Sequence, residues 1–229
     1  MQELSKRLQA IAGMVAYKTL VDVGCDHALL PIHLLQTGVI SKVIATDISA
    51  PSLEKGRQNA IALGLGNQLS FTLSDGLKNV DCDGIDICVI AGMGGGTIIS
   101  ILDGVPLDFK QIILSPQRDV ADVRRFVHQK GFDIVNEMLL IENRKFYNIM
   151  DARPSPSSRH CGLDLQSPPF GYDEAGYLFG QILIDKKCPT LGEYIKIEIR
   201  KTKKTLEGNL PQSRQEELLQ YMQVCLSLV

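Results

Sequence analysis

Short apolar runs alternate with amphipathic stretches along the first 130 residues of the chain. Five apolar runs have the length and composition of buried strands, and they cover residues 20–23, 43–47, 69–73, 85–91 and 110–114. Apolar residues at helical spacing predict an opening helix over residues 4–15 and further helices over residues 29–36, 52–63, 98–102 and 120–130. This alternation predicts a parallel sheet with helices on both faces.

Two further apolar runs break the alternation. They cover residues 133–142 and 145–152, and only Asn143 and Arg144 separate them. Two residues are too few for a helical crossover, so these strands must pair antiparallel. The sequence therefore predicts an α/β fold with a doubly wound, Rossmann-like sheet that is closed by an antiparallel hairpin. This is the outline of a class I methyltransferase.

The chain changes character after residue 152. Residues 153–171 are rich in proline, serine and glycine, which predicts an exposed loop. The patterns Thr190-x-x-Glu193 and Ser213-x-x-Glu216 are capping boxes, and each predicts the start of an amphipathic helix. We therefore expect a sheet domain over residues 1–152, a loop or linker over residues 153–188 and a small helical hairpin domain over residues 189–229.

Composition narrows the class of protein. The 229 residues are 45% hydrophobic and 22% charged, and the formal net charge is −2. No apolar run approaches the roughly 20 residues that span a bilayer, and the N-terminus lacks the apolar core of a signal peptide. We therefore expect a cytoplasmic protein without a membrane partner. The six cysteines show no C-x-x-C spacing, so we expect reduced thiols and no bound metal.

The first predicted strand ends in the loop Asp22-Val-Gly24-Cys25-Asp26-His27. Ligands bind at the carboxyl ends of strands in such sheets, and Gly24 lets the backbone approach a ligand closely. The second and third glycines of a dinucleotide fingerprint are absent, and Asp26 would place a carboxylate where a pyrophosphate should lie. A cationic cofactor without phosphates fits this loop better. We therefore predict S-adenosyl-L-methionine and exclude a nicotinamide-dependent dehydrogenase.

Other predicted strands also end in acidic or glycine-containing loops. Asp47 could accept hydrogen bonds from ribose hydroxyls and Asp75 from the adenine amine, whereas Gly92 and Met93 follow the strand where the methyl group must meet its acceptor. Carboxylates around the first loop would favour the ammonium and sulfonium groups. The predicted cofactor contacts are Asp22, Gly24, Cys25, Asp26, Asp47, Ile48, Asp75, Gly76, Ala91, Gly92 and Met93.

Several motifs resemble those of one family. They are Leu4-Ser5-Lys6-Arg7-Leu8, the run Asp22-Val-Gly-Cys-Asp-His-Ala-Leu-Leu-Pro31, Ile90-Ala-Gly-Met-Gly-Gly95, Asp122-Val-Arg-Arg125 and the terminal helical hairpin. Together they resemble the TrmK family of bacterial tRNA (adenine-22-N1)-methyltransferases over almost the whole chain. The resemblance implies S-adenosyl-L-methionine as cofactor, tRNA as substrate and N1 of adenine 22 as acceptor. One departure is Ser115-Pro-Gln117, where we expect Gln-Pro-Asn in the family.

The residues agree with a ring nitrogen as the acceptor. The chain has neither the Asn/Asp-Pro-Pro-aromatic turn used for exocyclic amines nor the Pro-Cys nucleophile used for carbon 5 of cytosine. Adenine N1 has an in-plane lone pair and chiefly needs alignment. Its methylated product is cationic unless N6 loses a proton, so a nearby carboxylate would assist. We predict Asp26 as this catalytic carboxylate and His27 as its orienting partner; a histidine satisfied by the backbone is the alternative for His27.

Clusters of cations predict the contacts with RNA. The densest cluster lies in the first C-terminal helix, where only Glu193 and Glu198 oppose it, although a charge run is also typical of a solvated helix face. The predicted RNA-binding residues are Lys6, Arg7, Arg124, Arg125, Lys196, Arg200, Lys201, Lys203 and Lys204. A small-molecule methyltransferase is one alternative. A catalytically silent RNA-binding protein is another, although converging carboxylates would serve no purpose in it.

Overall fold

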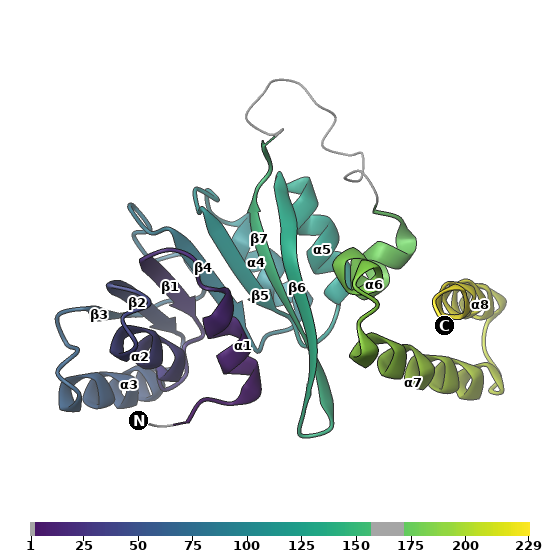
Figure 1. Cartoon of the computed structure of the whole chain (residues 1–229), viewed down its shortest axis with the longest axis horizontal. Helices are drawn as coiled ribbons and strands as arrows, with labels where there is room; N and C mark the ends of the chain where they lie inside the picture. Colours follow the sequence, from purple (N-terminus) through teal and green to yellow (C-terminus); the bar gives the residue numbers. More distant parts are fainter. Residues whose placement is uncertain (1–2, 157–171) are drawn as a thin grey trace.

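A computed structural model describes residues 3–156 and 172–229, and within them the chain forms a seven-stranded mixed sheet (Figure 1). The strand order is β3-β2-β1-β4-β5-β7-β6. The first five strands in the chain are parallel, whereas β6 and β7 form the antiparallel hairpin, and β7 pairs with β5. The α/β fold that the sequence predicts is confirmed. The strands are β1 (Thr19–Val23), β2 (Lys42–Asp47), β3 (Leu69–Leu73), β4 (Ile87–Ala91), β5 (Gln111–Ser115), β6 (Phe132–Glu142) and β7 (Lys145–Pro154).

Helices cover both faces of the sheet. One face carries α1 (Lys6–Met14), α2 (Leu29–Gln36) and α3 (Ala50–Ala62), and the other carries α4 (Gly95–Asp103) and α5 (Val120–Gln129). Each face has its own apolar core, because successive side chains of a strand point to opposite faces. In β5, for example, Ile113 belongs to the first core, whereas Ile112 and Leu114 belong to the second.

The pairing of β5 with β7 places the tip of the hairpin at the carboxyl edge of the parallel strands. Leu114, near the end of β5, pairs with Met150, whereas Ile112 pairs with Ala152. Since β7 begins at Lys145, its first residues lie beyond the end of β5 at this edge. The loops that follow β1, β2 and β4 open onto the same edge, which is where ligands bind in sheets of this kind.

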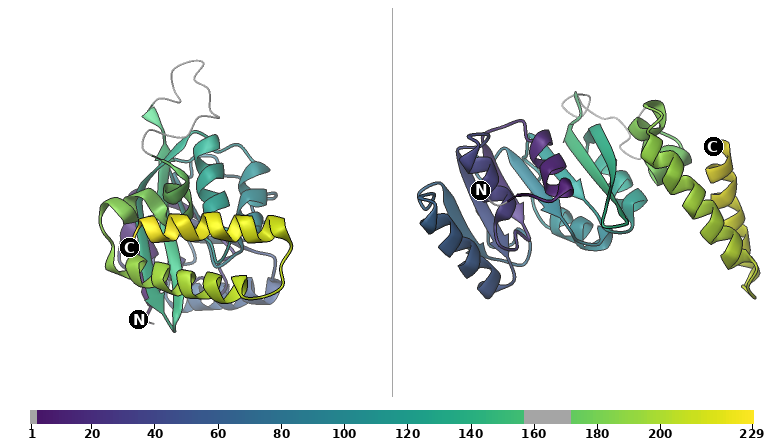
Figure 2. Two further views of the ribbon diagram at one scale, coloured as in Figure 1. Left: turned by 90° about the vertical axis from the view of Figure 1, so that its right-hand side faces the viewer. Right: turned by 60° about the horizontal axis from the view of Figure 1, so that its bottom comes forward.

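The C-terminal helices extend the fold beyond β6. A π-helix, η2 (Gly176–Gly180), runs into α6 (Gln181–Asp185), and α7 (Pro189–Leu206) and α8 (Gln212–Ser227) form the helical hairpin. These helices share a third apolar core with β6, which includes Leu139, Phe179, Ile195 and Cys225. Figure 2 shows α7 and α8 at one end of an elongated molecule, with β3 at the other. No helix of the described residues is long and apolar enough to cross a membrane.

Some predicted boundaries are wrong. The fourth strand begins at Ile87 rather than at residue 85, and part of the predicted linker is helical, since η2 and α6 lie within it. Neither capping box forms: α7 begins one residue after Cys188 and α8 one residue after Pro211, and no side chain caps either helix. A proline at the first helical position, as in α7, needs no N–H there and has a φ that suits the helix. Most of the predicted loop over residues 153–171 lies outside the described residues.

Arg124 is buried between the sheet and the C-terminal helices, so its prediction as an RNA contact is wrong. Its guanidinium donates to Glu137 Oε1 at 2.8 and 2.6 Å, to the Tyr177 carbonyl at 2.7 Å and to Asn148 Oδ1 at 3.2 Å. Both charged side chains are 0% exposed, and burial raises the pKa of Glu137 despite the neighbouring arginine. This hydrogen-bonded pair joins α5, β6 and η2, and removal of either partner would leave the other charge buried and unpaired.

Candidate functional site

A small cavity lies at the carboxyl edge of the sheet, beside the loop after β1. Its volume is about 90 Å³. It brings together predicted residues from three elements: the β1 loop, the end of β4 and α1. The lining residues are Arg7, Leu8, Asp22, Gly24, Cys25, Asp26, Leu29, Leu30 and Ala91. Four predicted cofactor contacts from the end of β1 and the loop after it therefore share a cavity with Ala91 and with the cation of Arg7.

The β1 loop is held against β2 by its backbone. The amides of Gly24 and Cys25 both donate to the carbonyl of Thr46, at 2.8 and 3.0 Å. Gly24 has a φ of +72°, and a Cβ atom at this position would collide with the Sδ-methyl end of Met93. Only glycine allows both this conformation and this close approach of Met93. Gly24 and Met93 therefore lie together at the edge, as the sequence predicts.

Asp47 connects the β1 loop to the end of β2. Its Oδ2 accepts from the Asp26 amide at 3.1 Å, and its Oδ1 accepts from the Ser49 amide at 2.8 Å. These two bonds fix the plane of the carboxylate and leave further lone pairs for a ligand. Ile48, the next residue, is 75% exposed and offers an apolar surface at the same edge.

Asp22 is the buried acid of the cavity. Asp22 belongs to β1, and its side chain is buried. Burial, with a smaller contribution from the charge of Asp47, raises the pKa of Asp22 to about 7. A cation bound in the cavity would favour the ionised form and offset this cost. Burial and the neighbouring carboxylates also raise the pKa of the Cys25 thiol, which keeps it neutral. The described residues contain no cluster of His, Cys, Asp and Glu side chains that could hold a metal ion.

Asp26 lies at the rim of this cavity, and His27 is the next residue of the loop. The Asp26 side chain is largely exposed, and the residue has a left-handed backbone conformation with a φ of +49°. His27 Nδ1 lies 3.5 Å from Asp26 Oδ1, longer than a well-formed hydrogen bond. The two side chains are adjacent, and their catalytic role stays a prediction.

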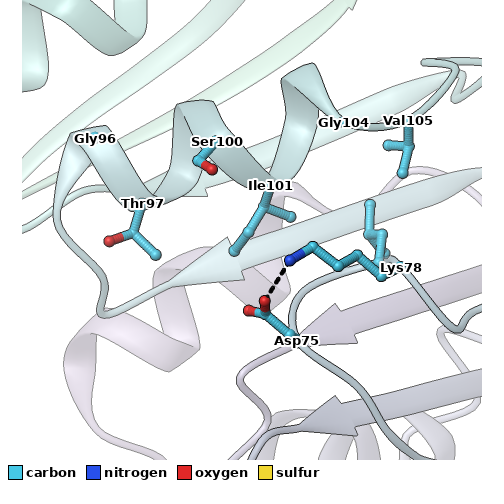
Figure 3. Close-up of a pocket in the computed structure, with 9 residues that line it drawn as sticks. Asp75, Lys78, Gly96, Thr97, Ser100, Ile101, Gly104 and Val105 are labelled. Atoms are coloured by element: carbon cyan, nitrogen blue, oxygen red, sulfur yellow. Dashed lines mark hydrogen bonds and ion pairs between the residues drawn. The ribbon is translucent and has the colours of Figure 1, made fainter.

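Asp75 follows β3 and faces a second, larger cavity beside α4. In Figure 3 its carboxylate is paired with Lys78, and Ile101 projects from α4 toward the pair. This cavity measures about 340 Å³. Gly76 is tied to β2, because its carbonyl accepts from Thr46 Oγ1 at 3.2 Å. A ligand amine at Asp75 would therefore have to share the carboxylate with Lys78.

Two side chains stand above Gly92, at the end of β4. A Cβ atom at Gly92 would lie 3.3 Å from Arg7 Nη1 and 3.9 Å from Gln117 Nε2. The Arg7 guanidinium also lies over the ring of Tyr147, with its central carbon 5.2 Å from the ring centre. Neither Tyr147 nor Gln117 is among the predicted site residues. Gln117 lies in the run Ser115-Pro-Gln117 that directly follows β5 and departs from the Gln-Pro-Asn expected in the family. No local motif marks Tyr147, because the pairing of β5 with β7 brings it to this edge.

The predicted cations of α7 are all exposed. Tyr194 in the first half of α7 packs against Phe146 of β7, with 5.0 Å between ring centres. Because Phe146 lies next to the hairpin tip, α7 contacts the carboxyl edge of the sheet and then runs outward (Figure 1). Lys201 pairs with Glu198 at 2.8 Å. The exposed cations are Lys196, Arg200, Lys201, Lys203 and Lys204.

The remaining predicted cations differ in their surroundings. Lys6 is exposed on α1. Arg125 forms an ion pair with Glu174 at 2.6 Å and lies over the ring of Tyr177, so its charge is already compensated. Of the predicted RNA-binding residues, those on α1 and α7 are thus best placed to meet a large anion near the cavity.

The sheet order, the closing hairpin and the acidic cavity at the carboxyl edge define a class I methyltransferase. The family model described as a methyltransferase domain matches residues 4–150. A curated relative, the tRNA (adenine(22)-N(1))-methyltransferase of Bacillus subtilis, is 27% identical over 190 residues, which are 81% of this chain and 76% of that protein.

Solved structures agree over the whole chain. The B. subtilis m1A22 tRNA methyltransferase TrmK has a TM-score of 0.85 and 25% identity, with 99% of this chain and 98% of that chain covered. Sp1610 of Streptococcus pneumoniae, with proposed tRNA (m1A22) methyltransferase activity and in complex with S-adenosyl-L-methionine, has a TM-score of 0.85, 28% identity and 99% coverage of both chains. The chain belongs to the methyltransferase domain family and, within it, to the TrmK family.

Proposed function

We propose that this protein uses S-adenosyl-L-methionine to methylate N1 of an adenine in tRNA, at the position of adenine 22. The observation that carries the proposal is the cavity at the carboxyl edge, in which the carboxylates of Asp22 in β1 and Asp26 in the following loop lie beside a backbone kept open by Gly24. Two relatives support the substrate and the cofactor: the B. subtilis enzyme is named for adenine 22, and the S. pneumoniae structure contains S-adenosyl-L-methionine.

The residues of the edge fit this cofactor. Asp22 is a buried carboxylate with a raised pKa, and a cationic amino-acid group would stabilise its ionised form. Asp26 adds a second carboxylate at the rim of the cavity. Asp47 has free lone pairs for ribose hydroxyls, and Asp75 can accept from the adenine amine. Ile48 supplies apolar surface for the adenine ring.

The bound cofactor supplies a methyl group on a cationic sulfur: the sulfur–carbon bond breaks, a bond to adenine N1 forms, and the positive charge passes to the adenine ring. The protein aligns N1 with the methyl group, which can lower the barrier by about 7 to 11 kcal/mol in favourable intramolecular cases. Asp26 stabilises the new charge or accepts the N6 proton, and His27 orients Asp26. The small-molecule alternative leaves the basic face of α7 without a role.

Contact with tRNA is made through α7 and α1. The cations of α7 are exposed, and this helix contacts the hairpin tip beside the cavity before it runs outward. With a net charge of −2 for the whole chain, the basic face of α7 is a local attraction for phosphates rather than a general one. An enzyme with this substrate works in the cytoplasm, on tRNA and without a membrane partner.

The test is methyl transfer from labelled S-adenosyl-L-methionine to unmodified bulk tRNA, followed by nucleoside analysis. We expect label in 1-methyladenosine. A tRNA transcript with guanine in place of adenine 22 is the matched control and should stay unlabelled. Unlabelled bulk tRNA with retained cofactor binding would favour the small-molecule alternative, and loss of both would contradict the catalytic account.

A further inference from the structure

Tyr147 presents one ring face at the place where the methyl acceptor must arrive. It lies near the start of β7 and is partly exposed. Ile149, two residues further on, belongs to the core on the α1 side, so Tyr147 faces the same side of the sheet. The Arg7 guanidinium that covers this ring also stands over Gly92 and lines the acidic cavity. Arg7 therefore links the ring directly to the candidate methyl-transfer site.

The Arg7 guanidinium that covers the Tyr147 ring indicates which kind of group this ring can bind. A guanidinium is flat and cationic, and it lies 5.2 Å from the ring centre. Among the described residues Arg7 has no ion pair and the Tyr147 hydroxyl has no hydrogen bond, so little holds this contact except the ring itself. An N1-methylated adenine is also flat and cationic. A tyrosine face attracts both kinds of group through the same quadrupole.

Resting on the proposed function, we propose that Tyr147 is the platform on which the target adenine stacks, in the place that the Arg7 guanidinium takes in the structure. An adenine extruded from RNA loses its stacking partners, and an aromatic side chain replaces them. The positive charge on the adenine grows as the methyl group moves to N1, so the ring stabilises the transition state more than the neutral base. Arg7, displaced from the ring, remains at the edge as a donor for RNA phosphates.

Substitution of the ring tests this inference. Tyr147→Leu should lower kcat/KM for tRNA by about 10- to 100-fold, which is the range for loss of one base–aromatic stack. Tyr147→Phe keeps the ring and loses only the hydroxyl, so it should stay within about threefold of the wild type. The affinity for S-adenosyl-L-methionine, measured by calorimetry, should change in neither variant.

Tyr17→Leu is the matched control. Tyr17 is partly exposed and also lies under a cation, Lys110, whose Nζ is 5.7 Å from the ring centre, but Lys110 precedes β5 and so lies at the opposite edge of the sheet. This variant should methylate tRNA within about threefold of the wild type. Loss of activity in Tyr147→Leu and Tyr147→Phe alike would overturn the platform, because it would assign the role to the hydroxyl or to packing.

A second measurement reports on stacking without turnover. A tRNA with 2-aminopurine at the target position becomes brighter when the base leaves the RNA stack and dimmer when it stacks on a new ring. The saturated complex with Tyr147→Leu should be brighter than the complex with the wild type. Two outcomes would overturn the platform and leave the proposed function intact. One is equal brightness of the two complexes, and the other is a kcat/KM of Tyr147→Leu within threefold of an active wild type. A wild type that leaves tRNA unmethylated overturns the proposed function and the platform with it.

Discussion

The loops at the carboxyl edge and the helical hairpin of α7 and α8 hold their charged side chains in different ways. At the edge, Asp22 is 6% exposed and both oxygens of Asp47 accept backbone hydrogen bonds. On α7 the cations are exposed, and Lys201 alone among the predicted ones forms an ion pair with a side chain in the described residues. Fixed, desolvated charges suit one small ligand in one orientation. Solvated lysines and arginines suit a long polyanion, which they attract through many weak, salt-sensitive contacts.

This comparison predicts that the two regions can be damaged separately. Changes at the edge should alter turnover or cofactor affinity and leave RNA affinity intact, whereas changes on α7 should do the reverse. The Arg124–Glu137 pair lies between the regions, so its loss should affect both.

The largest effect is expected at the rim of the cavity. Asp26→Asn should lower kcat by about 10² to 10⁴-fold, because the amide can neither accept the N6 proton nor balance the new charge. The affinity for tRNA should stay the same, and S-adenosyl-L-methionine should still bind, since Asp22 and Asp47 remain in place. Asp83→Asn, an exposed aspartate in the loop before β4, is the control and should leave kcat unchanged. Unchanged turnover in Asp26→Asn would remove this carboxylate from the mechanism.

A somewhat smaller effect is expected on stability at the boundary between the regions. Arg124→Ala should lower the free energy of unfolding by about 3 to 5 kcal/mol, because it leaves Glu137 buried and unpaired. Arg125→Ala removes the neighbouring, partly exposed ion pair and should cost about 0 to 1 kcal/mol. Urea denaturation measures both. Similar losses in the two variants would show that the buried pair has no special role.

On α7 the expected effect is on salt dependence. Neutralising Arg200, Lys201, Lys203 and Lys204 together should flatten the slope of log affinity for tRNA against log salt by about 3, with cofactor affinity unchanged. The control neutralises four exposed cations away from α7, beside β1, in β2 and on α3, namely Lys18, Lys42, Lys55 and Arg57. If the two variants have the same slope, the cations of α7 are an ordinary solvated face.

The smallest expected effect is a pH dependence of cofactor affinity that arises from Asp22. With a pKa of about 7, this carboxyl is largely protonated at pH 6 and ionised at pH 8. Since a cationic cofactor favours the ionised form, affinity for S-adenosyl-L-methionine should rise about tenfold over this range and level off above it. The proton binds the folded state more tightly than the unfolded one. The cofactor-free protein should therefore lose stability as the pH rises from about 4 to about 7.

Asp22→Asn provides the comparison for that pH profile. The variant should bind the cofactor more weakly, with an affinity that hardly changes between pH 6 and pH 8, and calorimetry at several pH values measures both. A wild-type profile as flat as that of Asp22→Asn would contradict the assignment.

The edge of the sheet was predictable because its signals are local. Strand periodicity and the glycine in Asp22-Val-Gly24 lie within a few residues of each other, and parallel strands necessarily end at one edge. The sequence thus placed the acids of β1 and β2 correctly at the carboxyl edge. Their detailed contacts, such as the amide of Asp26 on Asp47, required the structure.

Arg124 and Tyr147 show where sequence reasoning failed. Arg124 belongs to a pair of arginines that is typical of a surface patch, but its partners are Glu137, thirteen residues later, and the Tyr177 carbonyl, 53 residues later. The alternation of β7 gives the face of Tyr147, whereas its place at the edge depends on the register with β5. Contacts between elements far apart in the chain leave no periodic signal.

The position of Arg7 has a consequence for the order of folding. Helix α1 is synthesised before the sheet, yet two contacts at its start lie late in the chain: the Lys6 amide donates to Glu142 at 2.6 Å, and Arg7 covers Tyr147. A nascent chain that ends before β7 lacks the hairpin against which the start of this helix packs, and contacts so distant in sequence form slowly. Chains truncated before residue 145 should therefore bind no cofactor, whereas chains ending after residue 154 should begin to do so. Because α1 forms one wall of the cavity and docks fully only after β7 is made, cofactor binding would show that β7 has been synthesised.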